Sequence, residues 1–176
     1  MADAISTRIL AVEGPDGSGK TSIAQGLAAR LGGRYVKPFD GTVGLVIRWL
    51  HERADHELAS RVAWAAATRA VEVNQDAPWL IFDRHWVSVL AFTARAVPQI
   101  WMPPPPTVVC LAQRSAIAGR LQQRGASPEE IESSAGIVER FERLVKDYAL
   151  PVIDTTGTTP EEAVEQILRS GLLERR

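Results

Sequence analysis

The residues from Gly14 to Thr21 read G-P-D-G-S-G-K-T, which matches the pattern G-x-x-x-x-G-K-[ST]. Glycines let such a loop curl so that its backbone N–H groups point at phosphate oxygens. The lysine neutralises the β- and γ-phosphates, and the hydroxyl that follows it ligates Mg²⁺. The pattern therefore predicts a site for ATP and Mg²⁺, formed by Gly14, Asp16, Gly17, Ser18, Gly19, Lys20, Thr21 and Ser22.

A second group of reactive side chains follows the apolar run Trp79–Phe82, where the chain continues with Asp83, Arg84 and His85. Ligands of a parallel sheet bind at the carboxyl ends of its strands. A carboxylate in that place holds Mg²⁺, and a guanidinium clamps a phosphate through two hydrogen bonds. We expect Asp83 to share the metal with Thr21, and Asp83, Arg84 and Lys20 to be catalytic.

Short apolar runs alternate with helical patterns along the whole chain. The runs carry almost no polar residues, as strands covered on both faces do, and they span 9–12, 35–36, 79–82, 108–111 and 150–153. Helical patterns span 21–31, 42–53, 57–74, 128–148 and 160–170. The alternation predicts an α/β protein with a three-layer P-loop NTPase fold. Its five-stranded parallel sheet is flanked by helices on both faces, within one domain over 1–176.

The charge and cysteine content exclude several classes of protein. Lys and Arg total 20 and Asp and Glu total 21 among 176 residues, so the net charge of −1 gives no general field for nucleic acid or anionic membranes. No apolar run reaches the roughly 18 residues of a membrane span, and no secretory signal is visible. Cys110 is the single cysteine, which fits a reducing compartment. We expect a cytoplasmic protein with no nucleic-acid or membrane partner.

Other P-loop classes lack their accessory motifs in this sequence. A GTPase needs D-x-x-G after a middle strand and N-K-x-D for guanine. Outside the phosphate-binding loop itself, D-x-x-G occurs at 154–157, after the last run, and N-K-x-D is absent. The L-S-G-G-Q of ABC-type ATPases is absent too. A kinase of a nucleotide or another small molecule is the class that remains.

The chain resembles the thymidylate kinase family of P-loop nucleoside monophosphate kinases. The family begins with E-G-x-D-G-x-G-K-T, and residues 13–21 read E-G-P-D-G-S-G-K-T. Its D-R-Y-x-x-S-x-x-A-Y segment is similar to D-R-H-W-V-S-V-L-A-F at 83–92, and its A-A-D-R to A-A-T-R at 66–69. Its R-E-P-G-G-T and I-R-x-L segments are similar to residues 37–50. The resemblance runs over nearly the whole chain.

The resemblance implies an acceptor nucleotide beside the ATP. Asp16 would bind its 3′-hydroxyl, Arg69 and Arg84 with Lys37 would hold its 5′-phosphate, and Phe92 would favour deoxyribose. The acceptor site implied in this way comprises Asp16, Lys37, Arg48, Trp64, Arg69, Arg84, Ser88 and Phe92. Around the base the sequence departs from the family pattern, with Ala65 in place of a stacking Phe and with Val89 and Thr93 in place of polar residues. A homodimer is also implied.

A lid is expected over about 114–134, where this family closes a segment over ATP. Arg114 would bind ATP there. Gly17 stands where some members carry a catalytic Arg, so the lid must supply that charge. Arg120 and Arg124, four residues apart, would lie on one helix face and serve this catalytic role. Closure of the lid would exclude water and suppress hydrolysis of ATP.

Three functions are compatible with these residues. The first is an ATP-dependent kinase that moves the γ-phosphoryl group to the 5′-phosphate of a (deoxy)nucleoside monophosphate. The second is a kinase of a hydroxyl on a deoxynucleoside or specialised metabolite, which would need Asp40, Asp16 or Asp83 as general base. The third is a nucleotide-binding protein that no longer supports transfer, consistent with a lid that lacks the family's D-R-x-E pattern.

Overall fold

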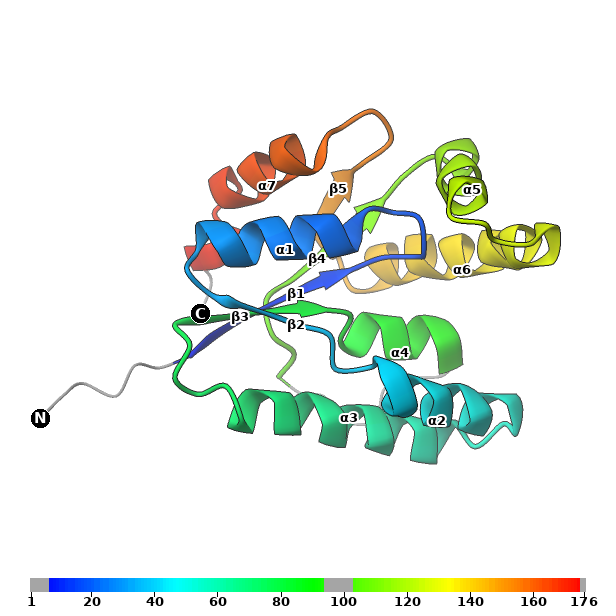
Figure 1. Ribbon diagram of the computed structural model, residues 1–176, viewed down its shortest axis with the longest axis horizontal. Helices are drawn as coiled ribbons and strands as arrows, with labels where there is room; N and C mark the ends of the chain where they lie inside the picture. The colour runs from blue at the N-terminus through cyan, green and yellow to red at the C-terminus, as the bar shows by residue number, and fades with distance from the viewer. Residues whose placement is uncertain (1–6, 94–102, 175–176) are drawn as a thin grey trace, which may run out of the picture.

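The computed structural model describes residues 7–93 and 103–174. Within them, parallel strands form one sheet in the order β2-β3-β1-β4-β5 (Figure 1). The strands are β1 (Arg8–Glu13), β2 (Arg34–Val36), β3 (Trp79–Asp83), β4 (Thr107–Leu111) and β5 (Val152–Asp154). The central strand β1 pairs with β3, placing Val12 opposite Asp83. The chain leaves β1 and β3 side by side, so the two sequence motifs meet at one end of the sheet.

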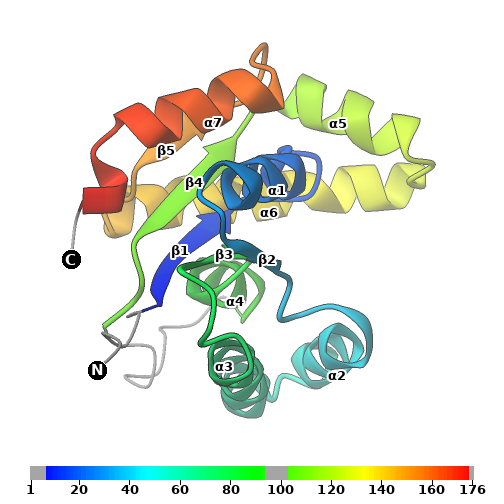
Figure 2. The ribbon, with the colours of Figure 1, turned by 60° about the vertical axis from the view of Figure 1, so that its left-hand side comes forward.

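Helices cover both faces of this sheet (Figure 2). On one face lie α1 (Lys20–Arg30) and α7 (Pro160–Arg169), and on the other α3 (His56–Glu72), α4 (Trp86–Thr93) and α6 (Pro128–Asp147). The helix α2 (Gly41–Glu52) packs against α3, and α5 (Arg114–Gln123) packs against α6. A short 3₁₀ helix, η2, spans Leu172–Glu174. The three-layer α/β fold predicted from the sequence is confirmed.

Two apolar clusters, one on each side of the sheet, form the main core. Leu10 and Val12 of β1 pack with Leu27 of α1 and Ile167 of α7. On the opposite face Phe82 of β3 packs against α3, α4 and α6. Both faces of the central strands are therefore buried, which accounts for the nearly unbroken apolar runs in the sequence.

The helices α6 and α7 begin at the capping boxes that their S/T-P-E-E sequences predict. The Ser127 hydroxyl accepts a hydrogen bond from the Glu130 backbone N–H at 3.2 Å, and the Glu130 carboxylate accepts one from the Ser127 N–H at 2.8 Å. Thr159 and Glu162 form the same pair of bonds at the start of α7. These local bonds fix where α6, between β4 and β5, and α7, after β5, begin.

One helix, α4, was not expected from the sequence. Its residues W-V-S-V-L-A-F-T show no helical periodicity because all of them except Phe92 are buried. A helix that is enclosed on every side has no polar face from which a 3.6-residue period can be detected.

Among the helices of the described residues, none combines the length and the hydropathy that a membrane span requires.

Candidate active site

The phosphate-binding loop joins β1 to α1, and Thr21 and Ser22 follow Lys20 in the first turn of that helix. Gly17 in this loop has φ +82°, a left-handed conformation that L side chains rarely adopt. A Cβ atom at Gly17 would lie 3.1 Å from Ile117 Cγ2 and 3.3 Å from Leu121 Cγ, both on α5. The helix α5 therefore packs directly on the loop where some family members carry an arginine.

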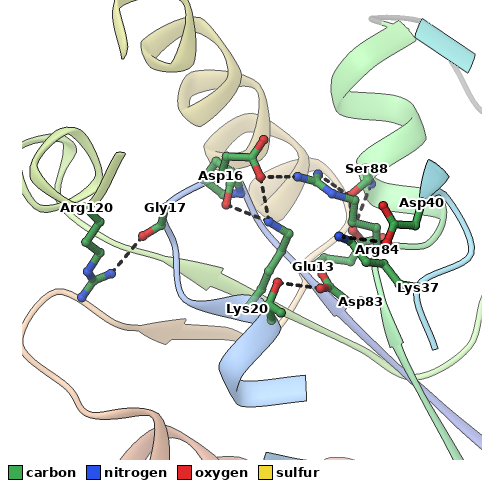
Figure 3. Close-up of polar contacts among 12 residues, drawn as sticks. Glu13, Asp16, Gly17, Lys20, Lys37, Asp40, Asp83, Arg84, Ser88 and Arg120 are labelled. Atoms are coloured by element: carbon green, nitrogen blue, oxygen red, sulfur yellow. Dashed lines mark hydrogen bonds and ion pairs between the residues drawn. The ribbon is translucent and has the colours of Figure 1, made fainter. Parts of the chain in front are cut away.

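Asp16 joins two cations that approach it from different elements (Figure 3). Its Oδ1 atom accepts hydrogen bonds from Lys20 Nζ at 3.2 Å and from Arg84 Nη2 at 2.6 Å. Burial opposes the ionisation of Asp16, but the charges of Arg84 and Lys20 outweigh it and lower its pKa. Burial, followed by the charge of Arg84, lowers the pKa of Lys20. The loop and the end of β3 are thus connected by one carboxylate.

Arg84 is held in an unusual backbone conformation, with φ +78°. Its N–H donates to the Val12 carbonyl at 3.1 Å, and its guanidinium lies 5.4 Å from the centroid of the Phe92 ring. Its Nη1 atom is 3.4 Å from the Ser88 hydroxyl. Strained backbone of this kind persists only where surrounding contacts hold it, and it is concentrated at functional sites.

Asp83 and Thr21 lie where the sequence predicts a cation. Asp83 Oδ2 accepts hydrogen bonds from the Thr21 hydroxyl at 2.6 Å and from the Tyr35 hydroxyl at 2.8 Å. Its other oxygen, Oδ1, is buried and has no hydrogen-bond partner among the described residues. Mg²⁺ prefers hard oxygen ligands, so this pair fits Mg²⁺. The described residues contain no cluster of three or more His, Cys, Asp or Glu suited to a metal, so phosphates and water would complete the coordination.

Next to the loop lies a cavity of about 500 Å³ between α2 and α4. Five of the residues predicted to bind an acceptor line it: Asp16, Arg48, Arg84, Ser88 and Phe92. Much of the remaining wall is apolar, from Phe39, Leu45, Ile47 and Val89, and His51 and Thr93 add polar groups. A mostly apolar pocket with a few fixed charged groups is typical of small-molecule sites.

The other predicted acceptor residues lie outside this lining. Lys37 pairs with Asp40, a residue of the cavity wall, at 3.4 Å. Trp64 is 41% exposed on α3. Arg69, also on α3, is exposed and forms an ion pair with Glu72 at 3.3 Å. The structure brings Lys37 to the rim of the cavity and does not bring Trp64 or Arg69 to its wall.

The three arginines predicted for the lid differ in their surroundings. Arg120 donates to the Gly17 carbonyl at 3.1 Å and to the Thr155 carbonyl at 2.5 Å, so it ties α5 to the phosphate loop (Figure 3). Arg114 forms an exposed ion pair with Glu139 at 2.9 Å. Arg124 is exposed and lies one residue beyond the end of α5, so only Arg120 lies on the expected helix face.

Sequence reasoning assigned no role to two partners in this site, the half-buried Tyr35 and the fully buried Glu13. Tyr35 on β2 donates to Asp83, as described above, and burial followed by that bond raises the pKa of its hydroxyl. Glu13, the last residue of β1, is fully buried and accepts hydrogen bonds from the start of α4. The signal available for Glu13 was a carboxylate directly following the buried apolar run 9–12.

The fold, the phosphate-binding loop and the adjoining cavity are those of a P-loop phosphotransferase. The family model described as thymidylate kinase matches residues 12–167. The chain belongs to the thymidylate kinase family, which confirms the resemblance and the predicted class, a nucleoside monophosphate kinase.

Relatives with different names share this similarity. A putative adenylate kinase of Pyrococcus furiosus is 31% identical over 91% of this chain and 82% of its own length. A probable thymidylate kinase 1 of Saccharolobus solfataricus is 27% identical over 92% of this chain and 95% of its own length.

Solved structures confirm the fold at much lower identity. Thymidylate kinase from Candida albicans superposes with a TM-score of 0.69 at 18% identity, covering 94% of this chain and 91% of that one. Deoxyadenosine kinase from M. mycoides superposes with a TM-score of 0.64 at 15% identity, covering 92% and 97%.

Proposed function

We propose that this protein transfers the γ-phosphoryl group of ATP, bound with Mg²⁺, to the 5′-phosphate of a (deoxy)nucleoside monophosphate. The observation that carries this proposal is the cavity beside the phosphate loop, which shares Asp16 with the loop and has Arg84 in its wall. Two anions must be brought together for such a transfer, and fixed cations between them offset their repulsion.

On the donor side, the backbone N–H groups of Gly14 and of residues 16–19, together with the Lys20 ammonium, would hold the ATP phosphates. Thr21 and Asp83 would hold the Mg²⁺, which supplies charge neutralisation when bound. The unpartnered Asp83 Oδ1 atom supports this assignment. Ser22 and Arg114 complete the proposed ATP site, Ser22 from the start of α1 and Arg114 from the start of α5.

The carboxylates beside the cavity support a phosphate acceptor over a hydroxyl acceptor. A hydroxyl acceptor needs a general base whose pKa lies near the working pH. The charges of Arg84 and Lys20 lower the pKa of Asp16 despite its burial, and the Gly41 N–H followed by Lys37 lowers the pKa of Asp40. Both groups are therefore weak bases. A phosphate monoester is already ionised and needs none.

We assign different roles to the arginines of the lid segment, 114–134. Arg120 already binds the backbone of the phosphate loop, so it would anchor α5 there during transfer. Arg124 is exposed at the end of α5 and is available to meet the transferring phosphoryl group when the segment closes. Closure would also exclude water from the reaction.

The acceptor base would lie against the apolar wall formed by Phe39 and Ile47, within reach of Arg48 and Ser88. Val89 and Thr93, which depart from the family pattern, line the same cavity. The relatives are named for adenylate and thymidylate, so AMP, dAMP and dTMP are the first acceptors to test. Phe92 against the sugar would favour the deoxy forms.

A coupled assay of ADP release tests this function across dTMP, dUMP, dCMP, dGMP, dAMP, AMP and thymidine. We expect Mg²⁺-dependent turnover with one or more monophosphates, abolished by Lys20→Ala while the fold is retained. Turnover with thymidine alone would establish a hydroxyl kinase instead. No turnover with any acceptor, despite ATP binding, would favour the nucleotide-binding alternative.

We also propose that the protein is a homodimer, as the family resemblance implies. Large apolar side chains remain exposed on neighbouring helices, Leu45 and Trp49 on α2 and Leu58 and Trp64 on α3. Large apolar side chains exposed on neighbouring helices are a common feature of protein interfaces. Light scattering coupled to size-exclusion chromatography measures the mass directly, and a mass near the 19.2 kDa of the single chain would refute the dimer.

A further inference from the structure

A single buried carboxylate connects the phosphate loop to the wall of the acceptor cavity. Glu13 is fully buried at the end of β1, one residue before Gly14. In the described part of the chain its carboxylate accepts four hydrogen bonds, all from the beginning of α4: from the N–H of His85 at 2.9 Å, of Val87 at 2.8 Å and of Ser88 at 3.2 Å, and from the Ser88 hydroxyl at 2.5 Å.

The segment held in this way forms one side of the acceptor cavity. Arg84 directly precedes the first donor, and Ser88, Val89 and Phe92 follow on the same helix and line the cavity. The first N–H groups of a helix have no partner within the helix, and a carboxylate is their strongest protein acceptor. Glu13 therefore fixes where α4 begins and how far it stands from the phosphate loop.

Burying the charge of the Glu13 carboxylate costs free energy, and the hydrogen bonds that it accepts must offset that cost. Burial raises the pKa of Glu13, although Ser88 and His85 oppose this through their hydrogen bonds. A neutral residue would avoid that cost but would not satisfy so many donors. Arg84, whose backbone is strained at φ +78°, also depends on the neighbouring chain being held.

We propose that Glu13 is a positioning residue for phosphoryl transfer: it sets Arg84 and the acceptor wall at a fixed distance from the phosphate loop. This inference rests on the proposed function. Reacting groups must approach to about 3–3.5 Å, and a displacement of about 1 Å costs roughly a hundredfold in rate. A residue that sets the spacing between the two sites therefore acts on the transfer without touching either substrate.

The variant Glu13→Gln tests this role because it keeps the size of the side chain and turns one acceptor into a donor that faces N–H groups. We expect kcat/KM for the acceptor to fall about ten- to a hundredfold, from the misplacement of Arg84. The Kd for ATP, measured by calorimetry without acceptor, should stay within about twofold of the wild-type value because the backbone of the loop is retained. If Glu13→Gln does not fold, Glu13→Asp keeps the charge, shortens the reach and carries the same expectation.

Trp86→Phe is the matched control for a loss of stability in the same helix. In the wild type, the buried Nε1 of Trp86 donates a hydrogen bond to the Thr107 hydroxyl at 3.0 Å, on the side of α4 that packs on the sheet. We expect it to lower Tm without changing the KM of the acceptor. Equal kinetic losses in Trp86→Phe and Glu13→Gln would overturn the positioning role.

A double-mutant cycle with Arg84→Lys separates a specific role from a general one. If Glu13 acts through Arg84, the kinetic effect of Glu13→Gln should largely disappear in the Arg84→Lys background, and additive effects would contradict the proposal. Normal acceptor kinetics of Glu13→Gln beside an active wild type would overturn this inference alone. An inactive wild type would overturn the proposed function, and this inference with it.

Discussion

Asp16 Oδ1 lies 2.6 Å from Nη2 of Arg84, although 68 residues separate them in the chain. The same oxygen is 3.2 Å from Lys20 Nζ, so one carboxylate balances the two cations expected to hold the donor and acceptor phosphates. Asp16 thus helps to hold both cations in place.

The variant Asp16→Asn should lower the Tm measured without ATP and increase the rise in Tm that ATP binding causes. Because the Asp16 side chain is 63% exposed, solvent screening limits the loss to about 1 kcal/mol, or about 2–4 °C in Tm. ATP phosphates replace the missing charge, so the rise in Tm on adding ATP should exceed that of the wild type. Thermal melts measure both, and Asp40→Asn, which removes the other carboxylate of the cavity wall, is the control. An equal ATP-induced rise in Asp16→Asn and wild type would contradict this account.

Arg120 and Arg124 form a matched pair for testing what holds α5 to the phosphate loop. Arg120→Ala leaves the Gly17 and Thr155 carbonyls without this donor, so we expect a loss of about 1–3 kcal/mol in the free energy of unfolding, and a higher KM for ATP. Arg124→Ala removes an exposed side chain and should stay within about 0.5 kcal/mol. Urea denaturation compares the two, and similar losses would show that the Arg120 bonds contribute little.

A substitution at Gly17 tests how closely α5 packs on the phosphate-binding loop. Gly17→Ala introduces a Cβ at 3.1 Å from Ile117 Cγ2 in a left-handed conformation, so we expect a loss of about 1–2 kcal/mol and weaker ATP binding. Gly119→Ala, in the interior of the same α5, meets nothing within 4 Å and should gain up to about 1 kcal/mol. Opposite signs in thermal melts are the expected result. A neutral Gly17→Ala would mean that α5 stands away from the loop in solution.

His85 should make the protein less stable in acid. Burial lowers its pKa to about 4, so the folded protein keeps it neutral while the unfolded chain protonates it below about pH 6.5. The unfolded state then binds more protons between pH 6.5 and 4, and stability falls as the pH drops, by at most about 1.4 kcal/mol per unit.

The variant His85→Gln isolates that contribution. The difference in unfolding free energy between wild type and variant should shrink as the pH is lowered from 7 to 4 and then become constant. Any dependence of the variant's unfolding free energy on pH that remains comes from other groups. One of them is His51, whose pKa is also lowered by burial and by His56. A difference that does not vary with pH would exclude His85 as the cause.

The strands and most helices were predictable because their signals are local. Strands buried on both faces read as apolar runs, and the phosphate loop and the capping boxes of α6 and α7 are contiguous motifs. The helix α4 was not predictable from its own residues, since what makes it a helix is its enclosure and the Glu13 carboxylate, 72 to 75 residues away. The acceptor for the N–H groups at the start of α4 is supplied by β1, which is distant from α4 in the sequence.

The residues of the candidate site also divide into those with a local sequence signal and those without one. Lys20, Thr21 and Asp83 were predicted from motifs at the ends of neighbouring strands, and the structure brings them together. Arg69 was expected at the acceptor phosphate because its A-A-T-R segment resembles the family's A-A-D-R. In the structure it pairs with Glu72 on α3, outside the cavity lining. The anchoring contacts of Arg120 depend on the chain folding back at Thr155, which no local pattern in the sequence indicates.

The helix α2 supplies Leu45, Ile47, Arg48 and His51 to the cavity, yet only Leu50 of this helix is buried. Substitutions at Leu45, Arg48 and His51, none of which is fully buried, therefore change the shape of the cavity without removing a buried core residue. Evolution can alter which nucleotide is accepted through α2 while the transfer chemistry stays intact. Directed evolution of new acceptors has the same route, and a library restricted to α2 should retain far more folded variants than one drawn from α4.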